Sequence, residues 1–137
     1  LYCGTGFFAI SMANEAKKTI GVELVPQAIA DAKINAELSG VQVEFIDAKT
    51  EDYDWMKIGA DVVILDPPRA GMHDKALKDV IAALPPRIVY VSCNYKNFAR
   101  EMVELSKYYD VEQIRAIDMF PHTPHVELVT ALIKKVA

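Results

Sequence analysis

The sequence predicts a doubly wound α/β domain from two observations about the order of its segments. Short apolar runs alternate with helical stretches, which is typical of a mostly parallel sheet with crossover helices. One run, at residues 61–65, is apolar on both faces, as expected of a central parallel strand. The 137 residues suit a single domain, and no repeat, low-complexity tract or internal boundary divides them.

The expected elements begin with a glycine turn at residues 4–6 that leads into a helix from residue 7 to about residue 17. A strand at 19–23 comes next. The helix after it begins at Pro26, because proline is favoured in the first helical turn, and ends near Ser39, before Gly40. The remaining central segments are expected as strands at 41–46, 61–65 and 87–92, and as helices at 75–84 and 97–108.

The two ends of the chain depart from this regular alternation. The last two strands, at 111–119 and 126–134, are joined by a link too short for another crossover helix, so antiparallel pairing is expected. At the other end only Leu1 and Tyr2 precede the glycine turn, whereas a strand usually needs about five residues. We therefore expect a truncated first strand, and residues 1–137 to be the C-terminal part of a longer protein.

Composition and charge limit the classes of function. Fifteen basic against nineteen acidic side chains give a net charge of −4, which is not typical of a domain that grips nucleic acid alone. No apolar run approaches the roughly 18 residues that span a bilayer, and no signal peptide opens the chain. Two cysteines, Cys3 and Cys93, make no disulfide framework, which favours a reducing cytoplasm. His122 and His125 lack a third ligand, so no metal is expected.

A nucleoside ligand is expected at the first turn. Gly4 and Gly6 let the backbone approach a ligand closely, and Glu23, at the end of the next strand, can hold both hydroxyls of a ribose. The turn lacks the third glycine of the dinucleotide fingerprint, and the sequence has no Gly-Lys-Ser/Thr phosphate loop. S-adenosylmethionine fits this pattern, because it carries a ribose and no phosphate. Tyr2 and Phe7 flank the turn, either against the ligand or as ordinary core aromatics.

The sequence does not decide which residue contacts the adenine of the ligand. Asp47, just after the third strand, is placed to reach the base, but Lys49 occupies the position where an acid would be expected.

The first chemical motif is Asp-Pro-Pro-Arg at 66–69, directly after the strand at 61–65. Open α/β sheets bind ligands at the carboxyl ends of their strands, and two prolines make a rigid ledge that aims Asp66 into that crevice. The Asp66 carboxylate is suited to accept a hydrogen bond from a base N–H or from a methyl donor. The alternative is a solvated loop with an aspartate at the strand end.

The second motif is Ser-Cys-Asn at 92–94, after the strand at 87–92. Carbon 5 of uracil is a poor nucleophile, but a thiolate added to carbon 6 turns the ring into an enolate whose carbon 5 is nucleophilic. Cys93 suits this role because a few per cent of a free cysteine is thiolate at neutral pH. The alternative is a buried, inert cysteine, and Cys3 is interpreted as a small packing residue of that kind.

The third motif is residues 118–127, between the last two strands. After a methyl group has been added, carbon 5 still carries its hydrogen, and a base must remove that proton before the cysteine can leave. Glu127, which enters the last strand beside two prolines and two histidines, is the candidate base. The alternative is an exposed strand residue.

Together these motifs resemble the RNA 5-methyluridine methyltransferases. The resemblance rests on Asp-Pro-Pro-Arg-Ala-Gly at 66–71, Val-Ser-Cys-Asn at 91–94 and residues 118–127, and it covers essentially the whole chain in order. Leu-Tyr-Cys-Gly-Thr-Gly at 1–6 and Gly-Val-Glu at 21–23 fit the same family's methyl-donor site.

The resemblance implies roles for individual residues. Cys93 would be the nucleophile and Glu127 the base, with Asp66 between the donor and the uracil. The donor site would be lined by residues of the first turn and the following strand, namely Tyr2, Gly4, Gly6, Phe7 and Glu23. Arg69 and Asn94 would contact the substrate.

The resemblance also implies a seven-stranded Rossmann-like methyltransferase sheet, mostly parallel with an antiparallel C-terminal strand. The substrate would be a uridine in tRNA or rRNA, held partly by upstream domains that often include a small RNA-binding β-barrel. Some members also hold an iron–sulfur cluster on upstream cysteines. Residues 95–98 depart from the family, since many relatives have a proline and a small-residue segment there.

Three other readings are weighed against this one. RNA 5-methylcytosine methyltransferases tend to carry a second cysteine after the proline of the fourth-strand motif, where this chain has Pro68 and Arg69. Amino-group methyltransferases favour an aromatic residue after Asp-Pro-Pro and need no cysteine. A non-catalytic nucleotide-binding or RNA-binding domain is the alternative from another class.

Overall fold

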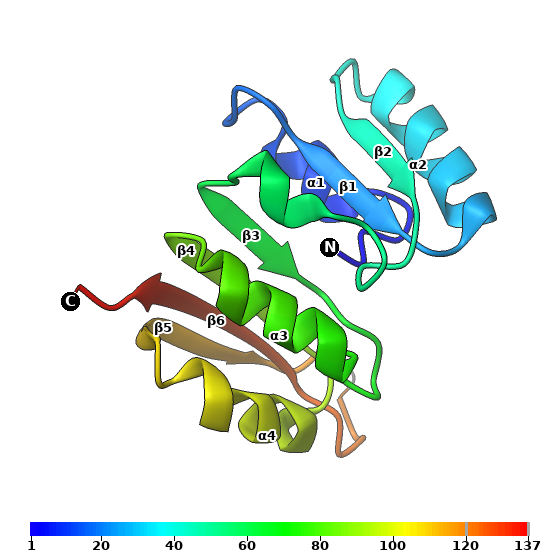
Figure 1. The fold of residues 1–137 in the computed structure, drawn as a ribbon. Helices are drawn as coiled ribbons and strands as arrows, with labels where there is room; N and C mark the ends of the chain where they lie inside the picture. Colours follow the sequence, from blue (N-terminus) through cyan, green and yellow to red (C-terminus); the bar gives the residue numbers. More distant parts are fainter. Residues whose placement is uncertain (120, 137) are drawn as a thin grey trace. The chain divides into compact units, whose positions relative to one another are not determined.

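The computed structural model describes residues 1–119 and 121–136, and it forms two compact units, Leu1–Tyr53 and Asp54–Ala137 (Figure 1). The first unit contains α1 (Phe7–Met12), β1 (Ile20–Glu23), α2 (Pro26–Leu38) and β2 (Glu44–Asp47). β1 and β2 pair in parallel, with Glu23 beside Asp47 at their carboxyl ends. The buried residues Val22, Ile29 and Ala32 form the core of this unit.

The first unit differs from expectation at its first strand and first helix. Residues 1 and 2 belong to no strand, and Tyr2 has a φ of 59°, outside the extended region. The amide of Cys3 donates to the carbonyl of Val22 at 2.9 Å. α1 ends at Met12 rather than near residue 17, where the Ala13 amide reaches only three residues back, to the carbonyl of Ile10. Such short bonds tighten and end a last helical turn.

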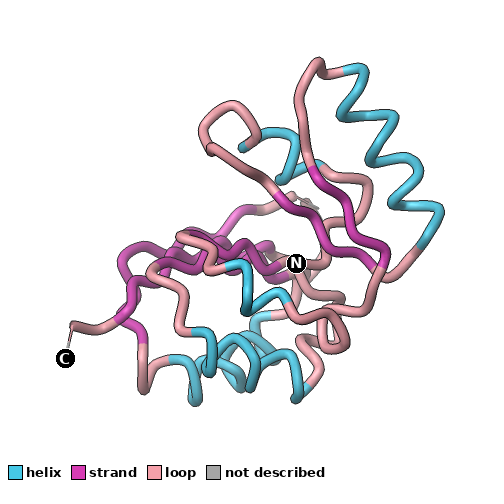
Figure 2. The backbone as a smooth tube through the Cα atoms, turned by 45° about the horizontal axis from the view of Figure 1, so that its top comes forward, coloured by secondary structure: helices cyan, strands magenta, loops and turns pink. Residues whose placement is uncertain are grey.

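The second unit is a four-stranded sheet with helices on one face. Its elements are η1 (Trp55–Ile58), β3 (Val62–Leu65), α3 (Asp74–Ala83), β4 (Arg87–Ser92), α4 (Tyr95–Leu105), β5 (Tyr109–Ile117) and β6 (Glu127–Lys134). The strand order is β3-β4-β6-β5. α3 and α4 lie on the same face of this sheet, as both views show (Figures 1 and 2).

The strand directions confirm the α/β class and the antiparallel C-terminal strand. β3 and β4 are parallel, whereas β6 is antiparallel to both β4 and β5, so β6 alone is reversed in this sheet. The expected count of seven strands is not reached, because the described residues contain six strands in two sheets. The short η1 helix, built around the buried Trp55, was not predicted.

The sequence predicted the start of α4 two residues too late. Asn94 has an extended backbone, and its side-chain oxygen accepts from the amide of Lys96, so the helix begins at Tyr95. The described residues include no helix that is both long and apolar enough to cross a membrane.

Candidate active site

The predicted donor residues other than Asp66 lie in the Leu1–Tyr53 unit, where Glu23 holds the glycine turn. One carboxylate oxygen of Glu23 accepts from the amide of Gly4 at 3.0 Å, and the other accepts from the amide of Val25 at 2.9 Å. Each oxygen of a carboxylate can accept two hydrogen bonds, so each keeps one position for a further donor. The half-buried Glu23 therefore shapes the turn and still has capacity for two ribose hydroxyls.

The two glycines of the turn serve different purposes. Gly4 has a φ of +51°, and a Cβ built there would meet nothing within 4 Å, so open space lies over this residue. Gly6 has a φ of +91°, and a Cβ there would crowd the side chains of Ile10, Phe45 and Ala32 at 3.0–3.2 Å. Gly4 thus leaves room for a ligand, whereas Gly6 allows α1 to pack closely against its neighbours.

Asn35 also braces the turn and was not identified from the sequence. Its side-chain amide, on α2, donates to the carbonyl of Thr5 at 3.0 Å, across 30 residues of chain. The available signal was its place on the helix that follows Glu23, but a polar residue on an amphipathic helix usually faces solvent.

The residues that flank the turn are exposed to different extents. Phe7 is 71% exposed, so it is not an ordinary core aromatic. Its ring packs edge-on against that of Phe8, with 5.2 Å between the ring centroids. Tyr2 is half-buried, and Asp47 is exposed next to Glu23 in the strand register. The Cys3 sulfur lies 2.8 Å from where a Cβ on Gly21 would stand, and burial raises the pKa of its thiol. Cys3 thus packs against β1, as predicted.

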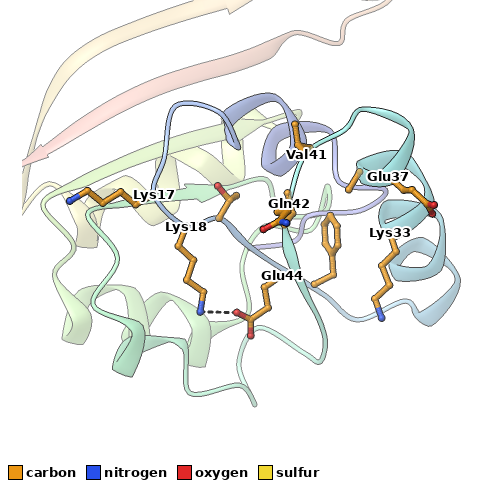
Figure 3. A pocket seen from close by; sticks show the side chains of 11 residues that line it. Lys17, Lys18, Lys33, Glu37, Val41, Gln42 and Glu44 are labelled. Atoms are coloured by element: carbon orange, nitrogen blue, oxygen red, sulfur yellow. Dashed lines mark ion pairs between the residues drawn. The ribbon is translucent and has the colours of Figure 1, made fainter.

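A hollow of about 510 Å³ in this unit lies away from these residues (Figure 3). It is lined by Thr19, Glu44 and Lys33, among others, and so opens at the amino ends of β1 and β2. Lys18 and Glu44 form an ion pair of 2.7 Å at its rim. The predicted donor residues lie at the carboxyl ends of the same strands, where α/β sheets bind their ligands, so we do not assign the donor to this hollow.

The predicted chemical residues lie in the Asp54–Ala137 unit, where strand register brings them to one edge of the sheet. Ser92 pairs with Leu128 across β4 and β6. β4 ends at Ser92 and β6 begins at Glu127, so Cys93, directly after β4, and Glu127 lie at the same end of this antiparallel pair, 34 positions apart in sequence. Asp66 follows the end of β3, the strand on the other side of β4.

Electrostatics also place Asp66 and Glu127 in one environment. Burial raises the pKa of the Asp66 carboxyl group, and the negative charge of Glu127 raises it further. Desolvation and a nearby like charge both disfavour the ionised form of a carboxylic acid. Asp66 is therefore not the freely solvated strand-end aspartate of the alternative reading.

The loop after β3, residues 66–72, is held to α4 through its main chain. Two side-chain amides, of Asn94 and Asn97, donate to the carbonyl of Arg69 at 3.0 and 2.8 Å. The guanidinium of Arg69 lies 2.9 Å from Nδ1 of His125. Arg69 therefore connects α4 to the segment before β6, and both predicted substrate residues, Arg69 and Asn94, belong to one hydrogen-bonded cluster.

Two residues of this cluster were not predicted to act here, Asn97 and His125. Asn97 lies in the segment that departs from the family pattern, and its spacing of three from Asn94 was the available signal, since both then share a helix face. For His125 a hydrogen-bonding or packing role was favoured over a metal, and here its Nδ1 lies within hydrogen-bond distance of Arg69. His122 is exposed, with a φ of 69°. Phe120 lies outside the described residues.

No cluster of three or more His, Cys, Asp or Glu side chains suited to a metal occurs among the residues that the structure describes.

Comparison with known proteins points to one family. The family model of the tRNA (uracil-5-)-methyltransferases matches residues 1–135. An uncharacterized RNA methyltransferase of Caldanaerobacter subterraneus is 47% identical over 98% of this chain and 30% of its own length. One of Streptococcus pyogenes serotype M1 is 44% identical over 98% of this chain and 31% of its own length.

One of the similar solved structures indicates the same family. The crystal structure of the Pyrococcus abyssi tRNA (uracil-54, C5)-methyltransferase in complex with S-adenosyl-L-homocysteine has a TM-score of 0.88 and 42% identity, covering 96% of this chain and 33% of that one. An N-methyltransferase of Bradyrhizobium japonicum, with a TM-score of 0.77 but 12% identity over 98% of this chain and 75% of that one, shares the fold. The chain thus spans about a third of the length of these family relatives.

Proposed function

Because the chain belongs to the tRNA (uracil-5-)-methyltransferase family, we propose that it is the catalytic domain of an enzyme that methylates carbon 5 of a uridine in tRNA or rRNA. The methyl donor would be S-adenosylmethionine, and the reaction would pass through a covalent adduct between Cys93 and uracil. The observation that carries this proposal is the β4–β6 register, which ends at Ser92 and Leu128 and so brings Cys93 and Glu127 to the same end of the sheet.

Each residue at that edge has a chemical task. The Cys93 thiolate adds to carbon 6, forming a carbon–sulfur bond, and the ring electrons move onto the carbon 4 oxygen as an enolate. S-adenosylmethionine, when bound, supplies an electrophilic methyl group for carbon 5. Glu127 then removes the proton that remains on carbon 5, and the returning electrons restore the ring double bond and expel the Cys93 thiolate.

Asp66 is suited to orient the substrate rather than to transfer the proton. Its raised pKa and its place beside Glu127 fit a carboxyl group that hydrogen-bonds a base N–H or the donor. Arg69 and Asn94, which are tied together through the Arg69 carbonyl, would line the same pocket for the target nucleotide.

The first turn suits a donor that carries a ribose. The Glu23 carboxylate retains acceptor capacity for two hydroxyls, and the space over Gly4 leaves room for the ligand. Phe7 is exposed and Tyr2 half-buried next to the turn, which fits side chains that border an adenosine. Asp47, adjacent to Glu23 in the register, is available for the adenine contact.

We further propose that the substrate RNA is gripped with help from other parts of a longer protein. A net charge of −4 gives this chain no excess of cations for phosphate binding. Its relatives are about three times as long, which leaves room for such parts.

The experiment that tests the proposal is single-turnover methyl transfer by the full-length protein, with labelled S-adenosylmethionine and unmodified cellular tRNA and rRNA. Nucleoside analysis should find the label in 5-methyluridine, and separating the two RNAs would identify the substrate. Label in 5-methylcytosine would favour the cytosine enzyme instead. No label in any RNA would favour a non-catalytic binding domain.

Covalent trapping gives an independent readout. RNA that carries 5-fluorouridine should form a stable adduct at Cys93, because the fluorine on carbon 5 cannot leave as a proton. Mass spectrometry of the denatured complex would detect the adduct, and a protein that transfers methyl groups without ever being trapped would contradict the covalent mechanism.

A further inference from the structure

One carboxylate that has no role in the proposed reaction is buried against the 66–72 loop. Glu101, on α4, is 1% exposed, and among the described residues it is the one Asp, Glu, Lys or Arg side chain that is buried. A buried charge is costly unless it is paired and hydrogen-bonded, so its contacts explain why it is tolerated.

Glu101 accepts hydrogen bonds from three different segments. One oxygen accepts from the amide of Met72 at 2.9 Å and from the Arg100 guanidinium at 3.2 Å. The other accepts from the hydroxyl of Tyr90, on β4, at 2.5 Å. The carboxylate thus joins α4, the strand before Cys93 and the end of the 66–72 loop.

The loop backbone lies directly against this carboxylate at Gly71. Gly71 has a φ of +87°, and a Cβ there would collide with the Glu101 carboxylate and lie 3.1 Å from Arg100 Nη2. Only glycine allows both the conformation and the close approach. The loop therefore has little freedom to move toward α4.

Asn94, Asn97 and Glu101 form a row along α4, at a spacing of three and four residues that brings side chains to one helix face. All three bond to main-chain atoms of residues 69–72, namely the Arg69 carbonyl and the Met72 amide. Because Asn94 caps α4 directly after Cys93, this row connects the Asp66 loop to the nucleophile.

We propose that Glu101 is a positioning residue, which holds the 66–72 loop, and with it Asp66 and Arg69, at a set distance from Cys93. The inference rests on the proposed function, since it assigns Glu101 a part in presenting the uracil ring to Cys93. Glu101 itself touches neither the substrate nor the reacting atoms.

Glu101→Gln tests this with little change of volume. In wild type, Met72 and Tyr90 donate to different oxygens of the Glu101 carboxylate. The glutamine amide has one acceptor oxygen in place of two, so it cannot accept both hydrogen bonds in this geometry. We expect a loosened loop and a single-turnover rate about 10- to 100-fold lower, because small misplacements of reacting groups cost about this much. The donor affinity should fall much less than the rate, because Asp66 is the only predicted donor residue that belongs to this loop and the others lie in the Leu1–Tyr53 unit.

The measurements are single-turnover methyl transfer, donor affinity by calorimetry, and amide hydrogen exchange of residues 69–72, all in the full-length protein. Glu104→Gln is the matched control, because Glu104 lies on the same helix but is only half-buried and is paired with Lys107 at 2.7 Å. It should change neither the rate nor the exchange.

Tyr90→Phe gives a graded comparison. It removes one donor but leaves the bond from Met72 to the carboxylate, so the loss of rate should be smaller than for Glu101→Gln. Equal losses of rate in the two variants would show that the hydrogen bond from the Met72 amide to Glu101 does not determine the rate.

A slow Glu101→Gln variant with faster exchange at residues 69–72 would support the inference. A rate within about twofold of wild type, or a slow variant whose loop stays fully protected, would overturn it. Exchange needs no activity, so if the wild type makes no 5-methyluridine, the proposed function fails while the exchange result still decides whether Glu101 holds the loop.

Discussion

The two groups of candidate site residues, one in each unit, are built over very different sequence distances. In the Leu1–Tyr53 unit, Glu23 holds Gly4 across 19 residues, within one turn, one helix and one strand. In the Asp54–Ala137 unit, Arg69 contacts His125 across 56 residues, and Cys93 and Glu127 come to the same end of the sheet only through the register of β4 and β6. A local motif can be recognised from its spacing, whereas a site assembled by register depends on the pairing of the whole sheet.

This contrast has a functional side. Under the proposed function, the group in the Leu1–Tyr53 unit would offer acceptors and open space to a donor, and the group in the Asp54–Ala137 unit would offer a nucleophile, a base and the 66–72 loop. Variants in the two groups should therefore fail in different ways, the first in donor affinity and the second in the rate of chemistry.

The largest effect is expected from Cys93→Ala, which removes the nucleophile. Turnover should fall by at least about 10⁴-fold, and no adduct with 5-fluorouridine RNA should form, because the addition to carbon 6 is lost. Labelled methyl transfer and mass spectrometry measure the two quantities. Cys3→Ala is the matched control and should keep its rate within about threefold, because Cys3 packs against Gly21. Full methylation by the Cys93→Ala variant would contradict the covalent mechanism.

The next effect is expected from Glu127→Gln, which separates methyl transfer from release. The variant should methylate one equivalent of RNA but turn over about 10²- to 10⁴-fold more slowly, because the proton on carbon 5 stays in place. The readouts are the burst amplitude and the amount of RNA still attached to the protein. Glu112→Gln, on β5 and ion-paired with Arg87 at 2.9 Å, is the control. Normal multiple turnover would show that Glu127 is not the base.

A smaller effect is expected from Glu23→Gln, in the Leu1–Tyr53 unit. The amide can no longer accept from both Gly4 and Val25 while facing a ribose, so donor affinity should fall about 10- to 100-fold, or about 1.4 to 2.8 kcal/mol. Calorimetry with S-adenosylmethionine measures this. Single-turnover rates at saturating donor should change much less. Glu44→Gln, at the opposite end of the strand pair, is the control, and equal losses in both variants would argue against a donor site at the first turn.

The smallest effect concerns stability at Asp66. The folded-state pKa of Asp66 is raised, so its ionised form destabilises the folded protein at neutral pH, and this cost disappears as the pH falls below the ordinary value of 3.8. Asp66→Asn should therefore raise the free energy of unfolding at pH 7 more than at acidic pH. Urea unfolding at both pH values, with exposed Asp110→Asn as the control, measures the difference. A variant that is destabilised at pH 7 would show that the carboxylate makes favourable contacts there.

Sequence reasoning predicted most of the elements correctly, and it was wrong at element ends that depend on hydrogen bonds rather than on the hydrophobic pattern. The helix that begins at Pro26 and the strand that ends at Ser92 lie as predicted, because proline and a continuous apolar run are strong local signals. The extent of α1 and the start of α4 were wrong, because the bonds that end or cap these helices were not visible in the hydrophobic pattern. Glu101 was missed entirely, since a charged residue on a helix usually faces solvent.

The sequence by itself determined the residue types of the site and their order along the chain. Glycines at the first turn, an acid at the end of the next strand, and Asp66 and Cys93 at strand ends follow from local rules about turns and parallel sheets. Only the tertiary structure decided that Cys93 and Glu127 lie at the same end of the β4–β6 pair and that Asn94, Asn97 and Glu101 bind one loop. The physical reason is that strand register and the burial of a charge depend on partners tens of residues away, which no local pattern specifies.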